Sequence, residues 1–283
     1  MTDSISAAKL AIYIILLQPA LYCLFKHGKT GLIGWLYAQI FCVLRIATGG
    51  IGLHETSSST GSIILNSIGL SPLLLAASGI LHEARRGTNP RLNRKLDIIL
   101  EIKYHGLVAA AMALIIVSVV GLQNGDSVST NKTLLKVASA LIALAWLLLA
   151  IWALWSLGKC QKSSLNNRAS SFHGGKLVSQ ILYHHQDRDA DADTSKLMYA
   201  VFINLPLLGL RLAYGIAYLQ LKISHPNSGF LTSKAVQVCL SVVPEMLITT
   251  IFLLVGVMTR NLKHEIKKLD SALPVGDEYE IQR

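Results

Sequence analysis

Seven apolar runs, each about 20 residues long, constrain the fold of this chain more than any other feature of its sequence. They cover residues 7–25, 32–53, 63–82, 100–122, 134–155, 197–221 and 235–258. A run of this length is what an α-helix needs to cross a bilayer. Each run is expected to be helical, because lipid offers no partner for an unpaired backbone group. The sequence therefore predicts an all-α polytopic membrane protein: a bundle of seven transmembrane helices, residues 1–258, followed by a cytoplasmic tail, residues 259–283.

Positive charge alternates between the connections and sets the expected orientation. Lys and Arg gather in the first, third and fifth connections and after the last run, whereas the other connections are nearly free of them. Basic residues concentrate in cytoplasmic loops, so we expect the N-terminus outside (lumenal) and the C-terminus in the cytoplasm. The same rule explains the net charge of +10 without a nucleic-acid partner. Asn131 begins a glycosylation sequon on the outer side, but it abuts the fifth run and is not expected to be occupied.

Two arginines lie inside apolar runs in matching contexts. Segment 44–49 (Leu-Arg-Ile-Ala-Thr-Gly) of the second run resembles segment 210–215 (Leu-Arg-Leu-Ala-Tyr-Gly) of the sixth, and these segments contain Arg45 and Arg211. An arginine at the bilayer centre costs about 2.5–3.5 kcal/mol on insertion scales. Two of them predict a polar site inside the bundle.

A proline recurs at equivalent places in the third and seventh runs, as Pro72 and Pro244. Together with the two arginines, this spacing is compatible with two parallel three-helix repeats joined by a linker helix. Chance similarity among apolar segments would give the same matches, so both interpretations stay open.

Glu245 is the strongest candidate for a catalytic residue, because it lies near the middle of the seventh run and directly after Pro244. Paired with an arginine, it stays ionised and holds the bundle together; unpaired, desolvation keeps it protonated and able to act as a general acid. Glu101 and Glu55, at the ends of other runs, are its rivals. Glu101 shares a helix face with His105, and an interfacial structural role is the alternative for each.

Tyr214 and Tyr218 follow Arg211 along one stripe of the sixth run. Their rings could stabilise a cation, or they could serve only as packing.

The longest connection, 156–196, contains an alternating acidic stretch, 187–193, which we interpret as a solvated loop rather than a divalent-metal site. The four cysteines lack metal-ligand spacing, and no phosphate-cradling glycine loop is present. The sequence predicts no metal and no cofactor.

The chain resembles the fungal seven-span membrane-bound terpene cyclase family of the ascofuranone-pathway type, small integral membrane proteins of secondary-metabolite clusters. The resemblance rests on segment 31–35 (Gly-Leu-Ile-Gly-Trp) leading to Arg45, on segment 210–215, and on Pro244-Glu245. It implies a metal-independent isomerase or lyase of the endoplasmic reticulum, in meroterpenoid biosynthesis. Such an enzyme cyclises a lipophilic prenylated, epoxidised small molecule after one proton is donated to it.

Under this resemblance, Glu245 would be the acid, with Glu101 or Glu55 as rival, and Arg45 and Arg211 would orient it or tune its acidity. Two other functions remain open on the residues alone. One is a small-solute or lipid transporter of the parallel-repeat type, and the other is a seven-span receptor. For all three functions we expect membrane lipids to surround the protein, and the sequence does not specify its oligomeric state.

Overall fold

The structure is a computed structural model that describes residues 4–54, 64, 69–88, 94–170, 179–224 and 228–260. All regular secondary structure within these ranges is helical, which confirms the predicted all-α class. The elements are α1 (Ser4–Lys26), α2 (Gly28–His54), α4 (Leu70–Thr88), α5 (Arg94–Asn124), α6 (Val128–Ser170), α7 (Ser179–Ser224), α8 (Gly229–Thr232), α9 (Lys234–Gln237), the π-helix η1 (Val238–Val242) and α10 (Val243–Met258).

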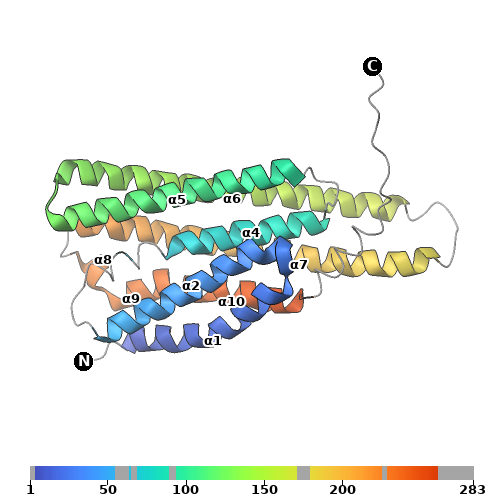
Figure 1. Ribbon diagram of the computed structural model, residues 1–283, viewed down its shortest axis with the longest axis horizontal. Coiled ribbons are helices and arrows are strands. Elements are labelled where there is room, and N and C mark those ends of the chain that lie inside the picture. The colour runs from blue at the N-terminus through green and yellow to red at the C-terminus, as the bar shows by residue number, and fades with distance from the viewer. Residues whose placement is uncertain are drawn as a thin grey trace, which may run out of the picture.

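The long helices lie side by side and alternate in direction (Figure 1). We call the end of the bundle where α1 begins the Ser4 end, and the end where it finishes the Lys26 end. α1, α4, α6 and α10 run toward the Lys26 end, whereas α2, α5 and α7 run back. α9, η1 and α10 follow one another without a break and form one continuous helical stretch.

Six of the described helical stretches are long and apolar enough to cross a membrane: Ser4–Lys26, Gly31–Leu53, Lys95–Asn124, Val128–Gly158, Asp193–Lys222 and Lys234–Met258. They correspond to six of the seven predicted spans, and they fit a multi-pass membrane protein. The remaining predicted span, 63–82, is described only at residue 64 and from residue 69 onward. Its described part belongs to α4, whose last two turns contain His82, Glu83, Arg85 and Arg86 and are therefore polar.

α4 lies at the centre of the bundle. Every residue from Leu70 to Ala84 is buried, and α4 packs against α2, α5, α6 and α7. Its closest approach is to α2, where a Cβ on Gly34 would lie 2.7 Å from the backbone nitrogen of Ile80, and one on Gly79 would lie 2.5 Å from the backbone of Gly34. Two glycines facing each other therefore let the two backbones touch, as small residues do in membrane helix pairs.

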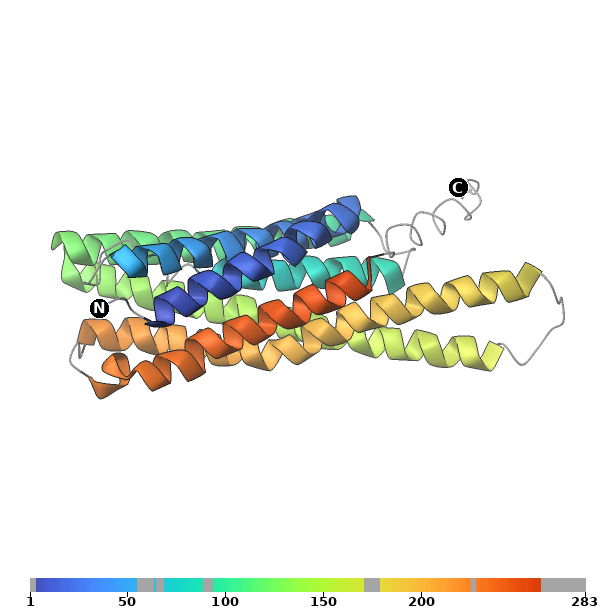
Figure 2. The same ribbon diagram turned by 90° about the horizontal axis from the view of Figure 1, so that it is seen from below.

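The prediction of a loop over 156–196 is wrong for most of that stretch, because it is helical. α6 continues to Ser170 and α7 begins at Ser179, so each is more than 40 residues long. At 1.5 Å per residue, each reaches roughly 65 Å, about twice the hydrocarbon thickness of a bilayer. Figure 2 shows the two helices projecting together beyond the Lys26 end. Apolar content marks only the part of a helix that lies in lipid, and residues such as Lys, Gln and Arg continue it into water.

The acidic stretch 187–193 is accordingly part of α7 rather than of a loop. The tail is described only at residues 259 and 260, so the remainder of the predicted tail, 261–283, lies outside the described residues.

Candidate functional site

Arg45, Arg211 and Glu245 form one buried cluster, here called the arginine–glutamate triad. Oε1 of Glu245 accepts hydrogen bonds from Nη2 of Arg45 and from Nε of Arg211, each at 2.5 Å. The three side chains are between 2 and 5% exposed. Because the three side chains come from α2, α7 and α10, the triad joins three helices that are each part of an apolar helical stretch long enough to cross a membrane.

Aromatic rings complete the surroundings of the two guanidinium groups. Arg45 lies over Phe41 at 5.1 Å, and Phe41 meets Tyr13 of α1 edge-on at 5.6 Å. Arg211 lies 5.8 Å from the ring of Tyr214. Ring faces attract cations most strongly where water is excluded, so these contacts help to offset the cost of burying the arginines.

The charge of the triad is unequal. Two guanidinium groups face one carboxylate, and Lys9 of α1, also buried, acts electrostatically on the same carboxylate. A carboxylate that accepts from two guanidinium groups is stabilised as the anion, which is the form that cannot donate a proton. The geometry therefore favours the pairing role of Glu245 over the role of a general acid.

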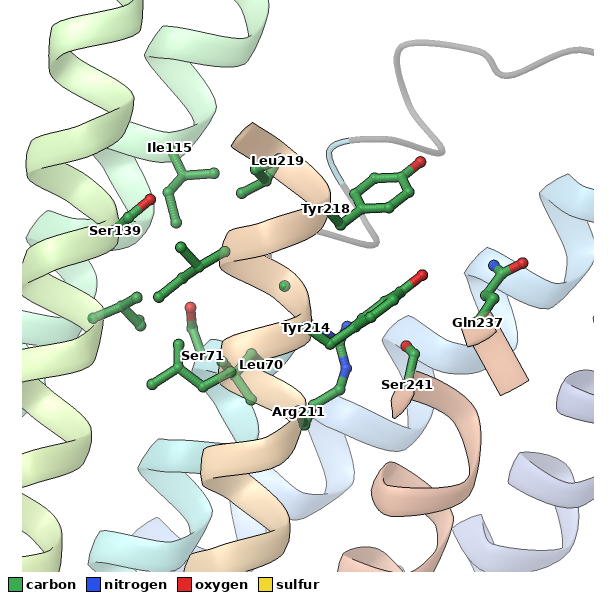
Figure 3. Close-up of a pocket in the computed structure, with 14 residues that line it drawn as sticks. Leu70, Ser71, Ile115, Ser139, Arg211, Tyr214, Tyr218, Leu219, Gln237 and Ser241 are labelled. Atoms are coloured by element: carbon green, nitrogen blue, oxygen red, sulfur yellow. The ribbon is translucent and has the colours of Figure 1, made fainter. Parts of the chain in front are cut away.

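A pocket of about 60 Å³ adjoins the triad on its Arg211 side. Figure 3 shows Arg211, Tyr214 and Tyr218 of α7 facing Gln237 and Ser241 of α9 and η1 across it. Ser71 of α4 adds a buried hydroxyl that has no hydrogen-bond partner among the described residues. The rest of the lining is mostly apolar and includes Leu70, Ile115, Ser139, Ile142, Leu212, Gly215, Ile216 and Leu219.

The π-helix η1 forms part of the pocket wall. Its Val243 amide bonds to the carbonyl of Val238, a five-residue spacing that widens the turn directly before Pro244 and Glu245. Such widened turns are uncommon and often occur at functional sites. The apolar run signalled only a regular helix here, so η1 was not predictable from the sequence.

A second pocket, of about 320 Å³, lies on the other side of Leu219, toward the Ser4 end. Lys132 and Lys222 line it together with Val119, Leu122, Gln123 and Val128. Leu219 lines both pockets, so the smaller and the larger pocket adjoin at this side chain.

A second buried cluster lies at the Lys26 end, around Glu83 of α4. Nδ1 of His27 donates to Oε1 of Glu83 at 2.7 Å, and Nε2 of His27 donates to the carbonyl of Gly256 at 2.8 Å. Nε1 of Trp35 donates to Oε2 of Glu83 at 2.9 Å. Burial alone would lower the pKa of His27, but its hydrogen bonds to Cys23, Glu83 and Gly256 outweigh burial and raise it to about 10. His27 is therefore an imidazolium at neutral pH.

His27 was not predictable as a buried site residue, because a histidine beside a basic connection is typical of the membrane interface. Glycines make room for this cluster. A Cβ on Gly31 would lie 2.5 Å from the carboxylate of Glu83, and a Cβ on Gly256 would overlap the indole of Trp35. Gly31 and Trp35 both belong to the 31–35 segment on which the family resemblance rests, and the structure gives them this packing role.

A third cluster joins α4 to α5. Asp97 pairs with Arg85 at 2.8 Å and with Nδ1 of His82 at 2.8 Å. One turn further along α5, Oε1 of Glu101 accepts from Ser78 at 3.0 Å and lies 3.6 Å from Nδ1 of His105.

The predicted site residues thus separate into groups. Arg45, Arg211 and Glu245 come together, with Tyr214 and Tyr218 beside them in the pocket. Glu101 lies in the third cluster and does not line either pocket. Glu55 lies outside the described residues.

Asn131, the predicted sequon, is buried in the second turn of α6, where its amide faces Gly121 of α5. Within the described ranges, no group of three or more His, Cys, Asp or Glu side chains is placed to hold a metal ion.

Comparison with known proteins identifies a single family. The profile described as "Domain of unknown function (DUF7702)" matches residues 1–173 and 174–262. No curated protein and no solved structure matches the chain significantly.

Proposed function

The chain belongs to the DUF7702 family, whose function is unknown, and we propose from its geometry that it is a membrane transporter for a small anionic solute or a lipid with a compact anionic head. The observation that carries this proposal is a buried arginine that lines a pocket. Arg45 and Arg211 share one oxygen of Glu245, and Arg211 lines the pocket together with the buried hydroxyl of Ser71, which has no partner among the described residues. A guanidinium group and a hydroxyl are donors that an anionic head accepts from.

The proposal includes a seventh transmembrane helix. α4 is too polar to qualify by hydropathy alone, but its central position supports its spanning the bilayer with its polar side chains turned toward other helices. The Lys26 end then faces the cytoplasm, since Lys26, Arg85, Arg86 and Arg260 belong to that end. The N-terminus lies on the opposite side.

The interrupted seventh span supports transport rather than a purely structural role for the triad. η1 and Pro244 interrupt the regular helix next to Glu245, and Ser241 of η1 lines the pocket. Irregular backbone at membrane depth is tolerated where it lines a cavity, and transporters use such helices at their binding sites. The convergence of Arg45 and Arg211 on Glu245 also fits two parallel repeats that meet at a midplane site.

The size of the pocket limits the ligand. Pockets for drug-sized ligands measure roughly 300–1,000 Å³, whereas this one holds about 60 Å³. It suits a carboxylate or a similar small head beside Arg211 and Ser71. An apolar tail would extend past Leu219 into the neighbouring pocket of about 320 Å³.

Thermal unfolding of the purified protein in detergent tests the binding step. The probes are medium-chain fatty acids, each compared with its uncharged methyl ester, and alkyl phosphates, each compared with its uncharged dimethyl ester. The acid should raise the melting temperature and the ester should not, because a ligand at about 100 times its Kd stabilises by roughly 2.7 kcal/mol. Arg211→Gln should abolish the shift, whereas the exposed Asp126→Asn should keep it.

Uptake of the stabilising acid into sealed proteoliposomes then tests transport itself. Uptake that the protein accelerates, without chemical change to the acid, supports the proposal. Equal stabilisation by acid and ester, or binding without any accelerated uptake, contradicts it.

A terpene cyclase remains the second proposal, and the aromatic group beside the pocket favours it. Tyr214 lies 6.1 Å from Tyr218 and 5.8 Å from Phe230, and such faces stabilise carbocations. In this proposal the protein resides in the endoplasmic reticulum and isomerises a prenylated epoxide. The pocket must then widen, and a donor other than the ionised Glu245 must supply the proton. Microsomes containing the protein, incubated with farnesylated aromatic epoxides, should yield a cyclic product of unchanged mass, and an unchanged panel contradicts the proposal.

A further inference from the structure

Four carboxylates are buried among the described residues: Glu83, Asp97, Glu101 and Glu245. Three of them accept a hydrogen bond from a cationic side chain at 2.8 Å or less, and each has a second nitrogen within 2.9 Å. For Asp97 this second contact, from Oδ2 to Nδ1 of His82, is an ion pair without hydrogen-bond geometry. Glu101 differs from all three, since its nearest donor is the neutral hydroxyl of Ser78 at 3.0 Å, whose one hydrogen is shared with the carbonyl of Leu75, also at 3.0 Å. Its other oxygen, Oε2, has no hydrogen-bond partner within the described part of the chain.

His105 is the nearest cationic candidate, and its geometry does not neutralise Glu101. Nδ1 of His105 lies 2.8 Å from the backbone carbonyl of Glu101, to which it donates, and 3.6 Å from Oε1, beyond hydrogen-bond distance. Nε2 of the same ring is buried and has no partner among the described residues. Nδ1 therefore directs its hydrogen at the backbone carbonyl rather than at the carboxylate of Glu101.

The other charged groups around Glu101 are already paired. From α4, Arg85 binds Asp97 and stacks on Trp152 of α6 at 4.8 Å, and His82 binds Asp97. From α5, Asp97 faces Glu101 as a like charge, and the buried hydroxyl of Tyr104 has no partner in the described ranges. From α2, Tyr37 stacks on His105 at 5.2 Å and adds no charge.

We propose that Glu101 and His105 form a proton-binding site within the membrane domain. A buried carboxylate that accepts no hydrogen bond from a cationic side chain is more stable as the neutral acid, because desolvation penalises the charged form. The bound species is a single proton, which converts the carboxylate of Glu101 to a carboxylic acid. Ser78 donates to the carbonyl oxygen of that acid, and the acid proton is carried on Oε2.

His105 provides the route to water. Its side chain is 18% exposed, whereas Glu101 is 4% exposed. A neutral ring that rotates to bring Nε2, buried in this arrangement, to water takes a proton there and releases the one on Nδ1 to Oε1 after closing the 3.6 Å gap. The imidazole then stays neutral and the carboxylate is neutralised. The proton settles on Oε2 when the carboxyl group rotates. This site shares no residue with the ligand pocket, so the proposal of a proton-binding site does not depend on the proposed ligand.

Infrared spectroscopy of the protein in lipid nanodiscs tests the proposal. The wild type at neutral pH should show the carbonyl stretch of a protonated carboxylic acid, and the band should disappear as pH is raised. Glu101→Gln should remove the band, whereas Asp126→Asn, at an exposed carboxylate, should leave it unchanged. A wild type without the band, a band that no accessible pH removes, or a band that survives Glu101→Gln overturns the proposal.

Two further variants keep the test informative if Glu101→Gln does not fold. Ser78→Ala should shift the same band to higher wavenumber, because the carbonyl oxygen loses its donor, and His105→Gln should slow the response of the band to a pH jump. A purely structural Glu101 would leave both the frequency in Ser78→Ala and the rate in His105→Gln unchanged, and that result contradicts the proposal.

Discussion

Arg45 and Arg211, on α2 and α7, donate to the same oxygen atom of Glu245. The sharing matters because each arginine depends on a carboxylate that the other also uses. Removing the carboxylate leaves two buried guanidinium groups without their counterion, whereas removing one arginine leaves a balanced pair.

Glu245→Gln should therefore destabilise the protein more than Arg45→Met does. Breaking a buried ion pair from one side costs about 3–5 kcal/mol, and here the loss affects two cations. Thermal unfolding of both variants in the same detergent measures the difference.

The fully apolar variant Arg45→Met/Arg211→Met/Glu245→Leu separates stability from function. Its stability should return close to that of the wild type, because replacing a whole buried ionic cluster is often neutral or stabilising. The acid-dependent thermal shift should nevertheless be lost. A variant that still binds the acid would contradict the proposed role of the triad.

The stability of the protein should depend on pH through His27. The folded-state pKa of His27 is raised to about 10 from an ordinary value of 6.5, so its contribution is fully present below about 6.5 and is lost as pH rises through about 10. The difference in melting temperature between wild type and His27→Gln should therefore shrink across this window. A constant difference would show that His27 is not charged in the folded protein.

Gly79→Ala should destabilise the contact between α2 and α4. The added methyl carbon would lie 2.5 Å from the backbone of Gly34, which cannot move aside as a side chain can. We expect a loss of about 1–3 kcal/mol or more, as for other overpacked sites.

Gly106→Ala is the matched control, because a Cβ there meets no atom within 4 Å. Alanine in a helix interior is favoured over glycine by about 0.5–1 kcal/mol, so this variant should be neutral or slightly more stable. Equal effects of the two substitutions would contradict the close packing of α2 and α4.

Asn131 should remain unglycosylated in a eukaryotic host. Its side chain is buried between α5 and α6, where the amide lies against Gly121. Digestion with an N-glycosidase should leave the gel mobility of the wild type unchanged and identical to that of Asn131→Gln. A mobility shift specific to the wild type would contradict the packing of this helix pair.

The spans were predictable because the hydrocarbon thickness fixes the length of an apolar run, and six runs became helices of that kind. The meeting of Arg45, Arg211 and Glu245 was anticipated only as a pairing, since buried ionisable groups seek partners. The packing of α2, α7 and α10 in three dimensions decides that both arginines donate to the same oxygen of Glu245. His27 was missed for the same reason, because its partners, Glu83 and Gly256, are distant in the chain.

The helical extensions of α6 and α7 were missed because hydropathy reports lipid contact rather than helix formation. In the opposite way, α4 lies at the centre of the bundle although its described residues, 70–88, are too polar to qualify as a span by themselves.

This property of α4 has a consequence for biogenesis. A nascent segment that contains His82, Glu83, Arg85 and Arg86 gains little by partitioning into lipid alone. Its favourable surroundings are supplied by α2, which is synthesised before it, and by α5, α6 and α7, which are synthesised after it. In the proposed seven-helix topology, α4 therefore completes its insertion only after the C-terminal half of the chain has been synthesised, and a ribosome stalled before α7 would leave this helix without part of its surroundings.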